Sequence, residues 1–249
     1  MPRIISIVSG KGGVGKTICS LNLALTLHQF GEKVVVVDSD ITASNLGFHL
    51  GYYSFPTSFQ NVLMGEAEIE EVIHRHPTGL HFIPSSISLS DINVRPKNMR
   101  QILASLPYDM VIVDSPPGLD TVAREVINAS DELLVITTPE TPAVANAVKV
   151  IRLAEETRKR LVGLIVNRFI GTETELKPEE IEMICEVPVL GVIPEDPAIR
   201  DSVFEKTPVV ALDPYCDASI AFKKIAAQLI GKVYQPPRFL GLRRLLGLL

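Results

Sequence analysis

The sequence predicts a doubly wound α/β fold, in which a mostly parallel sheet is flanked by helices within a single domain. Short runs of β-branched and other apolar residues alternate along the chain with segments of helical length. Those runs are apolar at consecutive positions, which is typical of strands that are covered on both faces. The chain of 249 residues is 46% hydrophobic, which is enough to bury one substantial core.

The order of these segments predicts parallel strands joined by right-handed crossovers. Paired prolines at 236–237 stop any preceding helix and indicate a linker. We therefore expect one domain over 1–233, a linker over 234–237 and a separate tail over 238–249. Strands are expected over 4–9, 33–40, 80–84, 109–116, 132–138, 161–167 and 187–194, with helices over 16–30, 97–105, 141–159 and 217–231.

Charge is distributed unevenly along the chain. Residues 1–217 carry all 29 acidic side chains and 18 of the 24 basic ones, a net charge of −11, whereas the remaining residues carry only basic groups. An acidic body argues against a surface adapted to nucleic acid, so we expect no nucleic-acid partner. A basic, apolar tail indicates an anionic partner of its own.

The cysteines and the apolar runs indicate a cytoplasmic protein. Cys19, Cys185 and Cys216 are isolated from one another, which predicts reduced, buried thiols. We expect no secretory leader, because the first apolar run leads directly into a glycine-rich loop. No apolar run approaches the ~20 residues that a membrane-spanning helix needs.

Residues 9–17, SGKGGVGKT, lie between the first expected strand and the first expected helix. The spacing of Gly10, Gly15, Lys16 and Thr17 fits the phosphate-binding pattern G-x-x-x-x-G-K-[ST]. Glycines let backbone N–H groups surround phosphate oxygens, and the helix N-terminus adds a partial positive charge. We expect Lys16 to reach the β- and γ-phosphates and Thr17 to bind Mg²⁺. The ATP-contacting loop is then Gly10, Lys11, Gly12, Gly13, Val14, Gly15, Lys16, Thr17 and Ile18.

The stretch GKGGVGKT resembles the deviant Walker A motif of the MinD/ParA family of P-loop ATPases. The resemblance implies hydrolysis of ATP to ADP and phosphate, and a homodimer that encloses two nucleotides. In that family the first lysine, here Lys11, crosses to the nucleotide of the partner subunit, where it stabilises charge as an arginine finger would. Judged from the residue alone, Lys11 is better interpreted as a solvated loop lysine.

Two acidic motifs follow expected strands, at the edge of the sheet where ligands of open α/β folds bind. They begin at Asp38 and Asp114, and Mg²⁺ suits such carboxylates because it prefers oxygen ligands and keeps several waters. Capping of the following loop or helix is the alternative for each. The resemblance implies that Asp38 and Asp114 lie at the metal and that Asp40 orients the attacking water. It also implies that Asn45 and Gly118 lie at the nucleotide.

Two further strand ends resemble the family's adenine-flanking positions. Asn167 and Arg168 end one expected strand, and Asn167 is expected to bond the edge of the base. Pro194, Glu195 and Asp196 end the next strand, although loop capping explains the two acids equally well. The guanine-reading pattern N-K-x-D is absent at 167–170, which favours ATP over GTP.

The tail at 238–249 forms an amphipathic helix when drawn on a helical wheel, with its large apolar residues within about 120°. Twelve helical residues span about 18 Å, so the tail is too short to cross a bilayer but long enough to lie at its surface. One tail binds marginally, whereas two tails on a dimer bind together. The alternative is packing against the body or a protein partner. The expected membrane contacts are Arg238, Phe239, Leu242, Arg243, Arg244, Leu245, Leu246 and Leu249.

Together these features predict an ATP-dependent dimerising switch, peripheral on the cytoplasmic face of the cell membrane. Because the tail resembles that of the MinD branch, the resemblance implies regulation of division-site placement through proteins that the sequence does not identify. The segment 141–160 is where such proteins could read the nucleotide state, unless its apolar positions only pack on the sheet. The alternatives are a ParA-like ATPase that partitions DNA or other cargo, and an iron–sulfur carrier or reductase component of the same fold.

Overall fold

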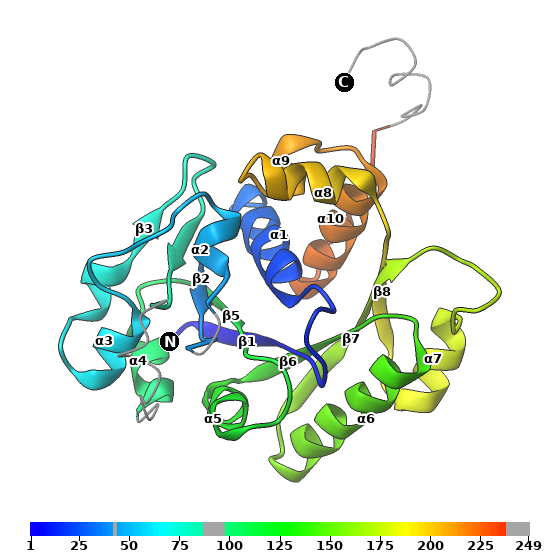
Figure 1. Cartoon of the computed structure of the whole chain (residues 1–249), viewed down its shortest axis with the longest axis horizontal. Helices are drawn as coiled ribbons and strands as arrows, with labels where there is room; N and C mark the ends of the chain where they lie inside the picture. The colour runs from blue at the N-terminus through cyan, green and yellow to red at the C-terminus, as the bar shows by residue number, and fades with distance from the viewer. Residues whose placement is uncertain (42–43, 87–97, 238–249) are drawn as a thin grey trace.

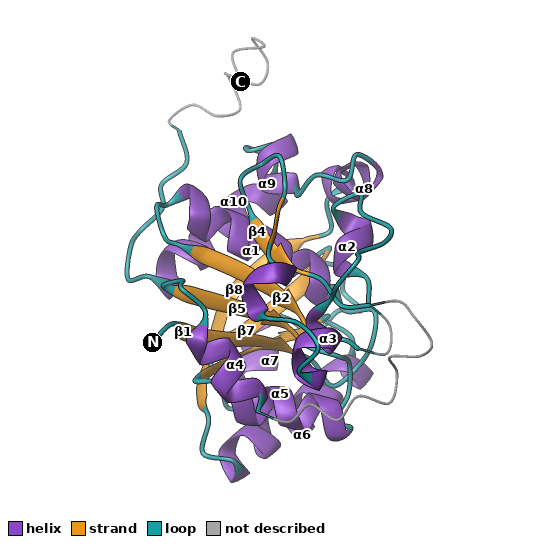
Figure 2. Cartoon of the chain, turned by 90° about the vertical axis from the view of Figure 1, so that its left-hand side faces the viewer, coloured by secondary structure: helices purple, strands orange, loops and turns teal. Residues whose placement is uncertain are grey.

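The computed structural model describes residues 1–41, 44–86 and 98–237. Within them eight strands form one sheet, which lies between two layers of helices (Figures 1 and 2). All neighbouring strands are parallel except β3, which pairs antiparallel with β4 at one edge. In sheet order the strands are β3 (His74–Arg75), β4 (His81–Ile83), β2 (Val34–Asp38), β5 (Met110–Asp114), β1 (Arg3–Val8), β6 (Glu132–Thr137), β7 (Arg160–Phe169) and β8 (Val189–Pro194). The doubly wound, mostly parallel fold is confirmed.

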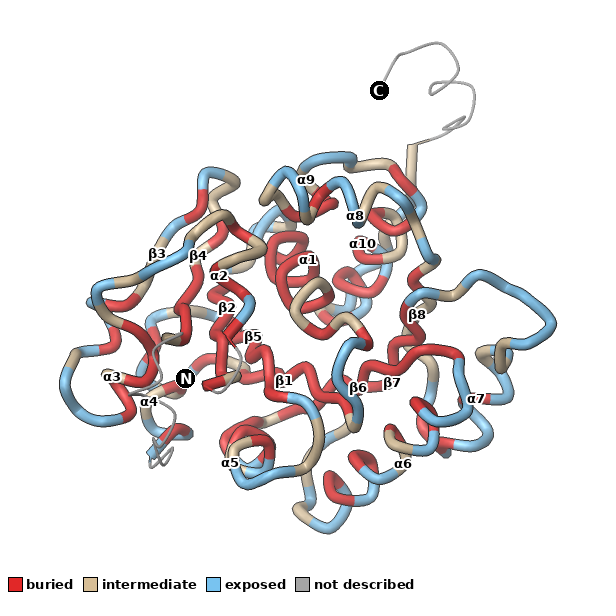
Figure 3. The backbone as a smooth tube through the Cα atoms, viewed as in Figure 1, coloured by how far each residue is buried: buried red, intermediate tan, exposed pale blue. Residues whose placement is uncertain are grey.

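One face of the sheet is covered by a layer built around α1 (Lys16–Gln29) and α10 (Asp217–Leu229). The α1 helix is buried along most of its length, as Figure 3 shows, because it packs against the sheet and against the other helices of this layer. A helix that is apolar on nearly all sides is expected in such a position. The same layer includes α2 (Leu46–His49), α8 (Pro197–Phe204) and α9 (Val209–Leu212).

The opposite face carries the remaining helices in two adjacent apolar clusters. Side chains alternate along β1, so Ile5 and Ile7 enter the α1 layer, whereas Ile4 and Val8 enter these clusters. The first cluster joins α3 (Phe59–Met64), the 3₁₀ helix η1 (Ile69–Val72), α4 (Met99–Ser105) and α5 (Thr121–Ala129). The second joins α6 (Thr141–Glu156) and α7 (Pro178–Cys185).

Several expected bounds differ from the observed ones. The strand expected over 33–40 ends at Asp38, because the N–H of Asp40 turns back to donate to the Asp38 carboxylate. The helix expected over 141–159 ends at Glu156, and Arg158 then adopts a positive φ of 55° before β7 begins. Helices α3, α5, α7 and α8 were not among the expected segments.

The order of the strands creates a switch point beside β1. The chain passes from β1 to β2 on one side of the sheet and later from β5 to β6 on the other side of β1. Ligands of open α/β sheets bind outside the carboxyl ends of the strands at such a point. The loops after β1, β2, β5 and β7 all leave the sheet at this edge, and these are the loops that carry the motifs.

Candidate functional site

The phosphate loop joins the end of β1 to the start of α1 in a conformation that needs glycine. Gly13 and Gly15 have φ values of 79° and 95°, in the left-handed region that L side chains rarely adopt. Gly10 is required for a different reason. A Cβ at this position would lie 2.2 Å from the carbonyl oxygen of Asn146 in α6, which is closer than non-bonded atoms approach. A Cβ on Gly15 would lie 2.3 Å from the Asn167 amide nitrogen. The loop is therefore shaped by backbone freedom at some positions and by close packing at others.

The two lysines of this loop have opposite environments. Lys16 is 8% exposed, and its Nζ donates a hydrogen bond to Ser9 Oγ at 3.0 Å. Burial lowers the pKa of Lys16, while the charges of Asp114 and Asp40 raise it again. Lys11 is exposed. Its backbone carbonyl accepts a hydrogen bond from the Ser9 hydroxyl at 2.8 Å. One cation thus faces the interior of the site and the other faces the surface.

The predicted metal carboxylates lie side by side on adjacent strands. Asp38 of β2 and Asp114 of β5 are register partners at the carboxyl ends of these strands, and both are buried. Burial raises the pKa of Asp38 to about 8, with a further contribution from the charge of Asp114. Burial also raises the pKa of Asp114 to about 6, although the Thr17 hydroxyl and Lys16 act in the opposite direction. Two buried, mutually repelling carboxylates beside a hydroxyl are a ligand set that a divalent cation would stabilise.

Hydrogen bonds hold each carboxylate in place. Asp38 accepts bonds from Ser44 Oγ at 2.7 Å and from the N–H of Asp40 at 3.0 Å, so it also organises the loop that follows β2. The capping alternative therefore describes part of what Asp38 does. Asp114 instead accepts from Ser20 Oγ of α1 at 3.0 Å, which ties β5 to the helix that follows the phosphate loop.

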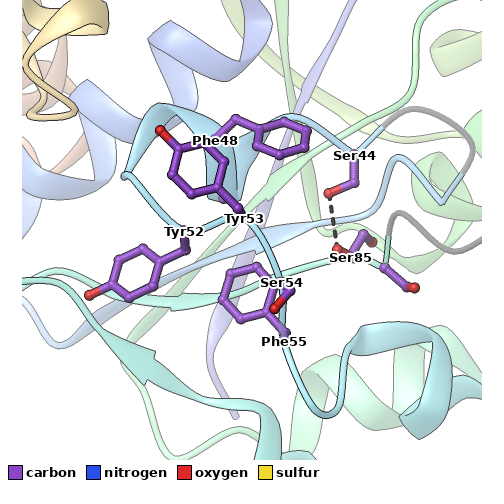
Figure 4. Close-up of a pocket in the computed structure, with 9 residues that line it drawn as sticks. Ser44, Phe48, Tyr52, Tyr53, Ser54, Phe55 and Ser85 are labelled. Carbon is purple, nitrogen blue, oxygen red and sulfur yellow. Dashed lines mark hydrogen bonds between the residues drawn. The ribbon is translucent and has the colours of Figure 1, made fainter.

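The loop after β2 is braced from a neighbouring segment (Figure 4). Ser85 Oγ donates to the carbonyl of Asp38 at 2.8 Å, and Ser44 Oγ also donates to the carbonyl of Ser85 at 3.0 Å. Beside this brace, Tyr52 and Phe55 help to line a cavity of about 220 Å³. Ser44 and Ser85 also line this cavity, so both serines connect Asp38 to the aromatic region.

The remaining residues predicted near the phosphates lie at the same edge. Asp40 is half-buried, and its charge contributes to the raised pKa values of Asp38 and Asp114. Gly118 has a φ of 84°, and its N–H donates to the carbonyl of Ser9 at 3.0 Å, which draws the loop after β5 against the phosphate loop. Asn45 precedes α2 and is exposed.

A cavity of about 240 Å³ adjoins the phosphate loop beside the ends of β7 and β8. Asn167 forms its polar wall: its Nδ2 donates to the carbonyl of Val14 at 2.7 Å, while its buried Oδ1 has no partner among the described residues. Arg168 has a positive φ of 58°, an uncommon conformation for arginine that turns the chain at this wall. The lining residues are Gly15, Ile18, His49, Asn167, Arg168, Glu195, Asp196, Ile199, Arg200 and Val203.

Comparisons with known proteins agree with this geometry. The family profile described as "AAA domain" matches residues 2–165. An uncharacterized ATP-binding protein of Methanocaldococcus jannaschii is 39% identical over 239 residues, which cover 94% of this chain and 90% of that protein. The structure of the septum site-determining protein MinD of Pyrococcus horikoshii, complexed with Mg-ADP, has a TM-score of 0.88 at 33% identity. It covers 93% of this chain and 97% of that one.

The chain belongs to the MinD/ParA family of P-loop ATPases. It is therefore an ATPase with the fold described above. A solved complex of MinC and MinD from Aquifex aeolicus is also similar, with a TM-score of 0.82 at 32% identity. It covers 95% of this chain and 98% of that one. The Mg-ADP of the Pyrococcus structure and the MinC of the Aquifex complex are described for those relatives and not for this chain.

A second profile, described as 4Fe-4S iron sulfur cluster binding proteins of the NifH/frxC family, matches residues 122–249. The described cysteines do not form a ligand set for such a cluster. Cys19 and Cys216 are buried in the α1 layer, whereas Cys185 is buried in the cluster of α6 and α7 on the other face. Over residues 1–41, 44–86 and 98–237, no group of three or more His, Cys, Asp or Glu side chains is placed to hold a metal ion.

The residues predicted to flank adenine at the end of β8 differ in their surroundings: Asp196 and Glu195 line the cavity, whereas Pro194 does not. The Asp196 carboxylate accepts from the N–H of Ala198 at 3.0 Å and from the N–H of Ala218 at 3.1 Å, so it caps α8 and ties it to α10. This is the capping alternative, and both carboxylate oxygens are used in it. Pro194 ends β8 but does not line the cavity. Glu195 is exposed at the rim.

Sequence reasoning missed four residues that line this cavity. Three of them, Ile199, Arg200 and Val203, come from α8, whose approach to the phosphate loop is a tertiary feature without a local signal. The fourth, His49, lies one helical turn after Asn45, a spacing that the sequence does contain. No histidine was among the predicted site residues.

The predicted membrane contacts at 238–249 lie outside the described residues. Of the helices that the structure describes, none has the length and apolar character needed to cross a membrane. The linker at 234–237 is described and contains no helix, and Tyr234 lies against Phe30 of the body with a centroid separation of 6.1 Å.

Proposed function

We propose that this ATPase is a Mg-ATP-dependent dimerising switch in which Lys11 completes the nucleotide site of a second copy. The observation that carries this proposal is the contrast between the two lysines of one loop. Lys16 is buried among Ser9, Asp114 and Asp40, whereas Lys11 projects from the exposed part of the loop. An exposed cation beside a phosphate site is available to the phosphates of another molecule.

Within one subunit, the roles we propose follow from the positions of the side chains. Backbone N–H groups of the phosphate loop and Lys16 would hold the phosphates. Thr17, Asp38 and Asp114 would hold Mg²⁺, the carboxylates in part through water. Bound Mg²⁺ would supply positive charge that offsets the charge developing in phosphoryl transfer. Asp40, half-buried beside these groups, would orient the attacking water. Positioning and charge stabilisation suffice for this reaction, so no strong base is needed.

The cavity beside Asn167 suits adenine better than guanine. Because Nδ2 of Asn167 already donates to Val14, the amide points its acceptor Oδ1 away from that bond, and this atom is still without a partner. Adenine offers an amino group to such an acceptor, whereas guanine offers a carbonyl oxygen at the equivalent position. Ile18, Ile199 and Val203 supply apolar contact for a flat ring. This supports ATP as the substrate.

We further propose that the dimer binds the membrane through its tails and takes part in spatial regulation such as division-site placement. The basic, apolar sequence of 238–249 and the likeness to MinD proteins support this. Regulatory proteins would read the exposed face of α6. Its apolar residues Val144 and Val150 pack in the core, as the alternative interpretation held, but Lys149 and Arg152 remain exposed. The MinC complex of the Aquifex relative supports a protein partner of this kind.

Sizing of the full chain with ATP and with ADP tests the dimer. We expect a dimer with ATP, a monomer with ADP, and for Lys11→Ala a weaker ATP-dependent dimer that forms only at higher protein concentration. Lys16→Ala is the matched control: it should lose nucleotide binding itself, whereas Lys11→Ala should keep the ADP affinity of the monomer. Repeating the measurement with liposomes tests the membrane step. A monomer that hydrolyses ATP at the full rate would contradict the proposal.

A ParA-like role in partitioning DNA is the second candidate. It predicts DNA binding that depends on ATP and weakens steeply with salt. The acidic body disfavours it, because residues 1–217 carry a net charge of −11. A gel-shift assay with ATP at low and high salt separates this role from the membrane role.

A further inference from the structure

The chain folds back along the body after α10 instead of leaving it at the end of that helix. Gly231 follows the helix with a φ of 67°, in the left-handed region that favours glycine. The N–H of Lys232 donates to the carbonyl of Ala227 at 2.8 Å, which closes a Schellman turn at the helix end. Because this turn reverses the chain, Tyr234 lies beside Lys223 in the middle of α10.

A buried cation holds this returning segment. Lys223 is 8% exposed, and its Nζ lies 5.0 Å from the ring centroid of Tyr215 and 5.8 Å from that of Tyr234. A cation within about 6 Å of a ring centroid is attracted to the face of the ring. Nζ also donates to the carbonyl of Pro214 at 2.6 Å, which fixes its position. The Tyr234 ring contacts Phe30 as well, at 6.1 Å between centroids. We call the side chains of Phe30, Tyr215, Lys223 and Tyr234 the linker clamp.

We propose that the linker clamp fixes the point at which the tail leaves the body, and that Tyr234 is the residue that positions the tail. This inference rests on the membrane role proposed above and adds the part of the body that controls it. Only residues 235–237 lie between the clamp and the tail, and two of these three are prolines, which keep the connection short and stiff. Without the clamp, the connection would begin at the end of α10 and lengthen to residues 230–237.

The length of this connection matters for a dimer but not for a monomer. Once one tail of a dimer is bound, the other binds at an effective concentration that falls as about the −3/2 power of the connecting length. Shortening the connection from residues 230–237 to residues 235–237 therefore raises this concentration about fourfold. A monomer binds through a single tail and gains nothing from the shorter connection. The clamp thus favours the dimer over the monomer at the membrane.

Fluorescence of the full chain in the absence of lipid tests whether the clamp forms. The sequence has no tryptophan, so Tyr234→Trp introduces a single one, and an indole ring is the best partner for a cation. We expect acrylamide to quench it weakly, and much more strongly once Lys223→Met is added. Lys224→Met is the matched control and should change nothing, because Lys224 is exposed on another side of α10, where it lines a pocket with Leu190 and Val192.

Two results of this experiment would overturn the proposal. One is a Tyr234→Trp protein that acrylamide quenches as strongly as free tryptophan, since the ring would then not be held on the body. The other is equal quenching in the proteins with Lys223→Met and Lys224→Met, since the buried cation would then not hold the ring.

Binding of the full chain to anionic liposomes tests the positioning role, at a protein concentration at which every variant dimerises with ATP. For Tyr234→Ala we expect the affinity with ATP to fall about fourfold and the affinity with ADP to stay unchanged. Tyr234→Phe keeps the ring and should bind as the unmodified protein does. Equal affinity of Tyr234→Ala and the unmodified protein with ATP would overturn the proposal. An equal loss with ATP and ADP would also overturn it, because Tyr234 would then be a membrane contact and not a positioning residue.

Failure of the unmodified protein to bind liposomes with ATP is a different result. It would contradict the membrane role of the tail. The quenching experiment contains no lipid, so it still decides whether Lys223 and Tyr234 hold the linker on the body.

Discussion

Gly10 and Gly12 of the phosphate loop are two residues apart, yet they differ in the space around them. A side chain at Gly10 meets the backbone of α6, with the nearest atom at 2.2 Å. At Gly12 the nearest atom is Pro117 Cβ, at 3.8 Å, which is ordinary contact. The first glycine is required by packing between elements, and the second leaves room at the surface. The phosphate-loop sequence has glycine at both positions and does not reveal this difference.

Gly10→Ala should therefore lower the free energy of unfolding by about 1–3 kcal/mol, because α6 must move away from the loop. Gly12→Ala should change it by less than about 0.5 kcal/mol. Urea unfolding of the nucleotide-free protein measures both. Equal stability of the two variants would show that the close approach of Gly10 to Asn146 does not exist in solution.

At the scale of helices and strands, α8 is preceded by Asp196, an acidic residue whose side chain stabilises the fold. Asp196 caps α8 through Ala198 and reaches the first turn of α10 through Ala218. Its neighbour Glu195 is exposed, and its N–H donates to the carbonyl of Phe169 in β7. The side chain of Asp196 thus joins two helices, whereas Glu195 is linked to β7 through its backbone.

Asp196→Ala should lower the free energy of unfolding by about 1–3 kcal/mol, since a helix cap and a second hydrogen bond are lost together. Glu195→Ala should have little effect on stability. Thermal and urea unfolding compare the two variants, and titration with Mg-ADP supplies the second readout. If Asp196→Ala is as stable as the unmodified protein but binds ADP far more weakly, Asp196 is a ligand and not a cap.

The elements that sequence predicts well are those whose pattern is complete within a short segment. Strands such as β2 and β5 are apolar at consecutive positions, and the phosphate loop carries its geometry in its own glycines. β3 has two residues and α2 has four, too few for any periodicity to show. The early end of α6 depends on Arg158 at positive φ, which nothing in its residue type signals.

The residues of the candidate site likewise divide into those that the sequence predicts and those that only the fold brings together. Lys16, Asp38 and Asp114 were predictable, because each follows a recognisable strand and the carboxyl ends of parallel strands meet at one edge. Part of the wall of the cavity beside Asn167 was predicted as well, but its residues from α8 were not, because α8 reaches it from far along the chain. Pro194 was placed there by resemblance, but it lies outside the cavity. Local motifs thus indicated the phosphate loop and the ends of β7 and β8, and only the fold brought α8 to the same cavity.

For the whole molecule, the distribution of cysteines bears on the iron–sulfur alternative. All three thiols are buried, in clusters on both faces of the sheet, and burial is the main cause that raises the pKa of each. A cluster needs thiolates that can meet around a metal. We expect the native protein to resist a thiol reagent such as DTNB and to react at three sites after unfolding. Iron and sulfide in the purified protein would contradict this view.

The tail provides the second prediction for the whole molecule. A chain that ends at residue 237 should still form an ATP-dependent dimer and hydrolyse ATP, but it should not sediment with anionic liposomes. The full chain should sediment far better with ATP than with ADP, since pairing two tails raises avidity by about 10²–10⁴. Equal sedimentation with the two nucleotides would count against a membrane switch.

The most direct test of the central claim is whether Lys11 acts on the neighbouring subunit. Lys11→Ala and Asp40→Asn should each lack activity alone, since one cannot supply the lysine and the other cannot orient the water. In an equal mixture, at a protein concentration at which both variants dimerise with ATP, half of the dimers are mixed. In each of these, the Lys11→Ala subunit keeps Asp40 and receives Lys11 from its partner. We expect ATP hydrolysis to recover to about a quarter of the unmodified rate. No recovery, from variants that still dimerise, would show that Lys11 does not act across the interface.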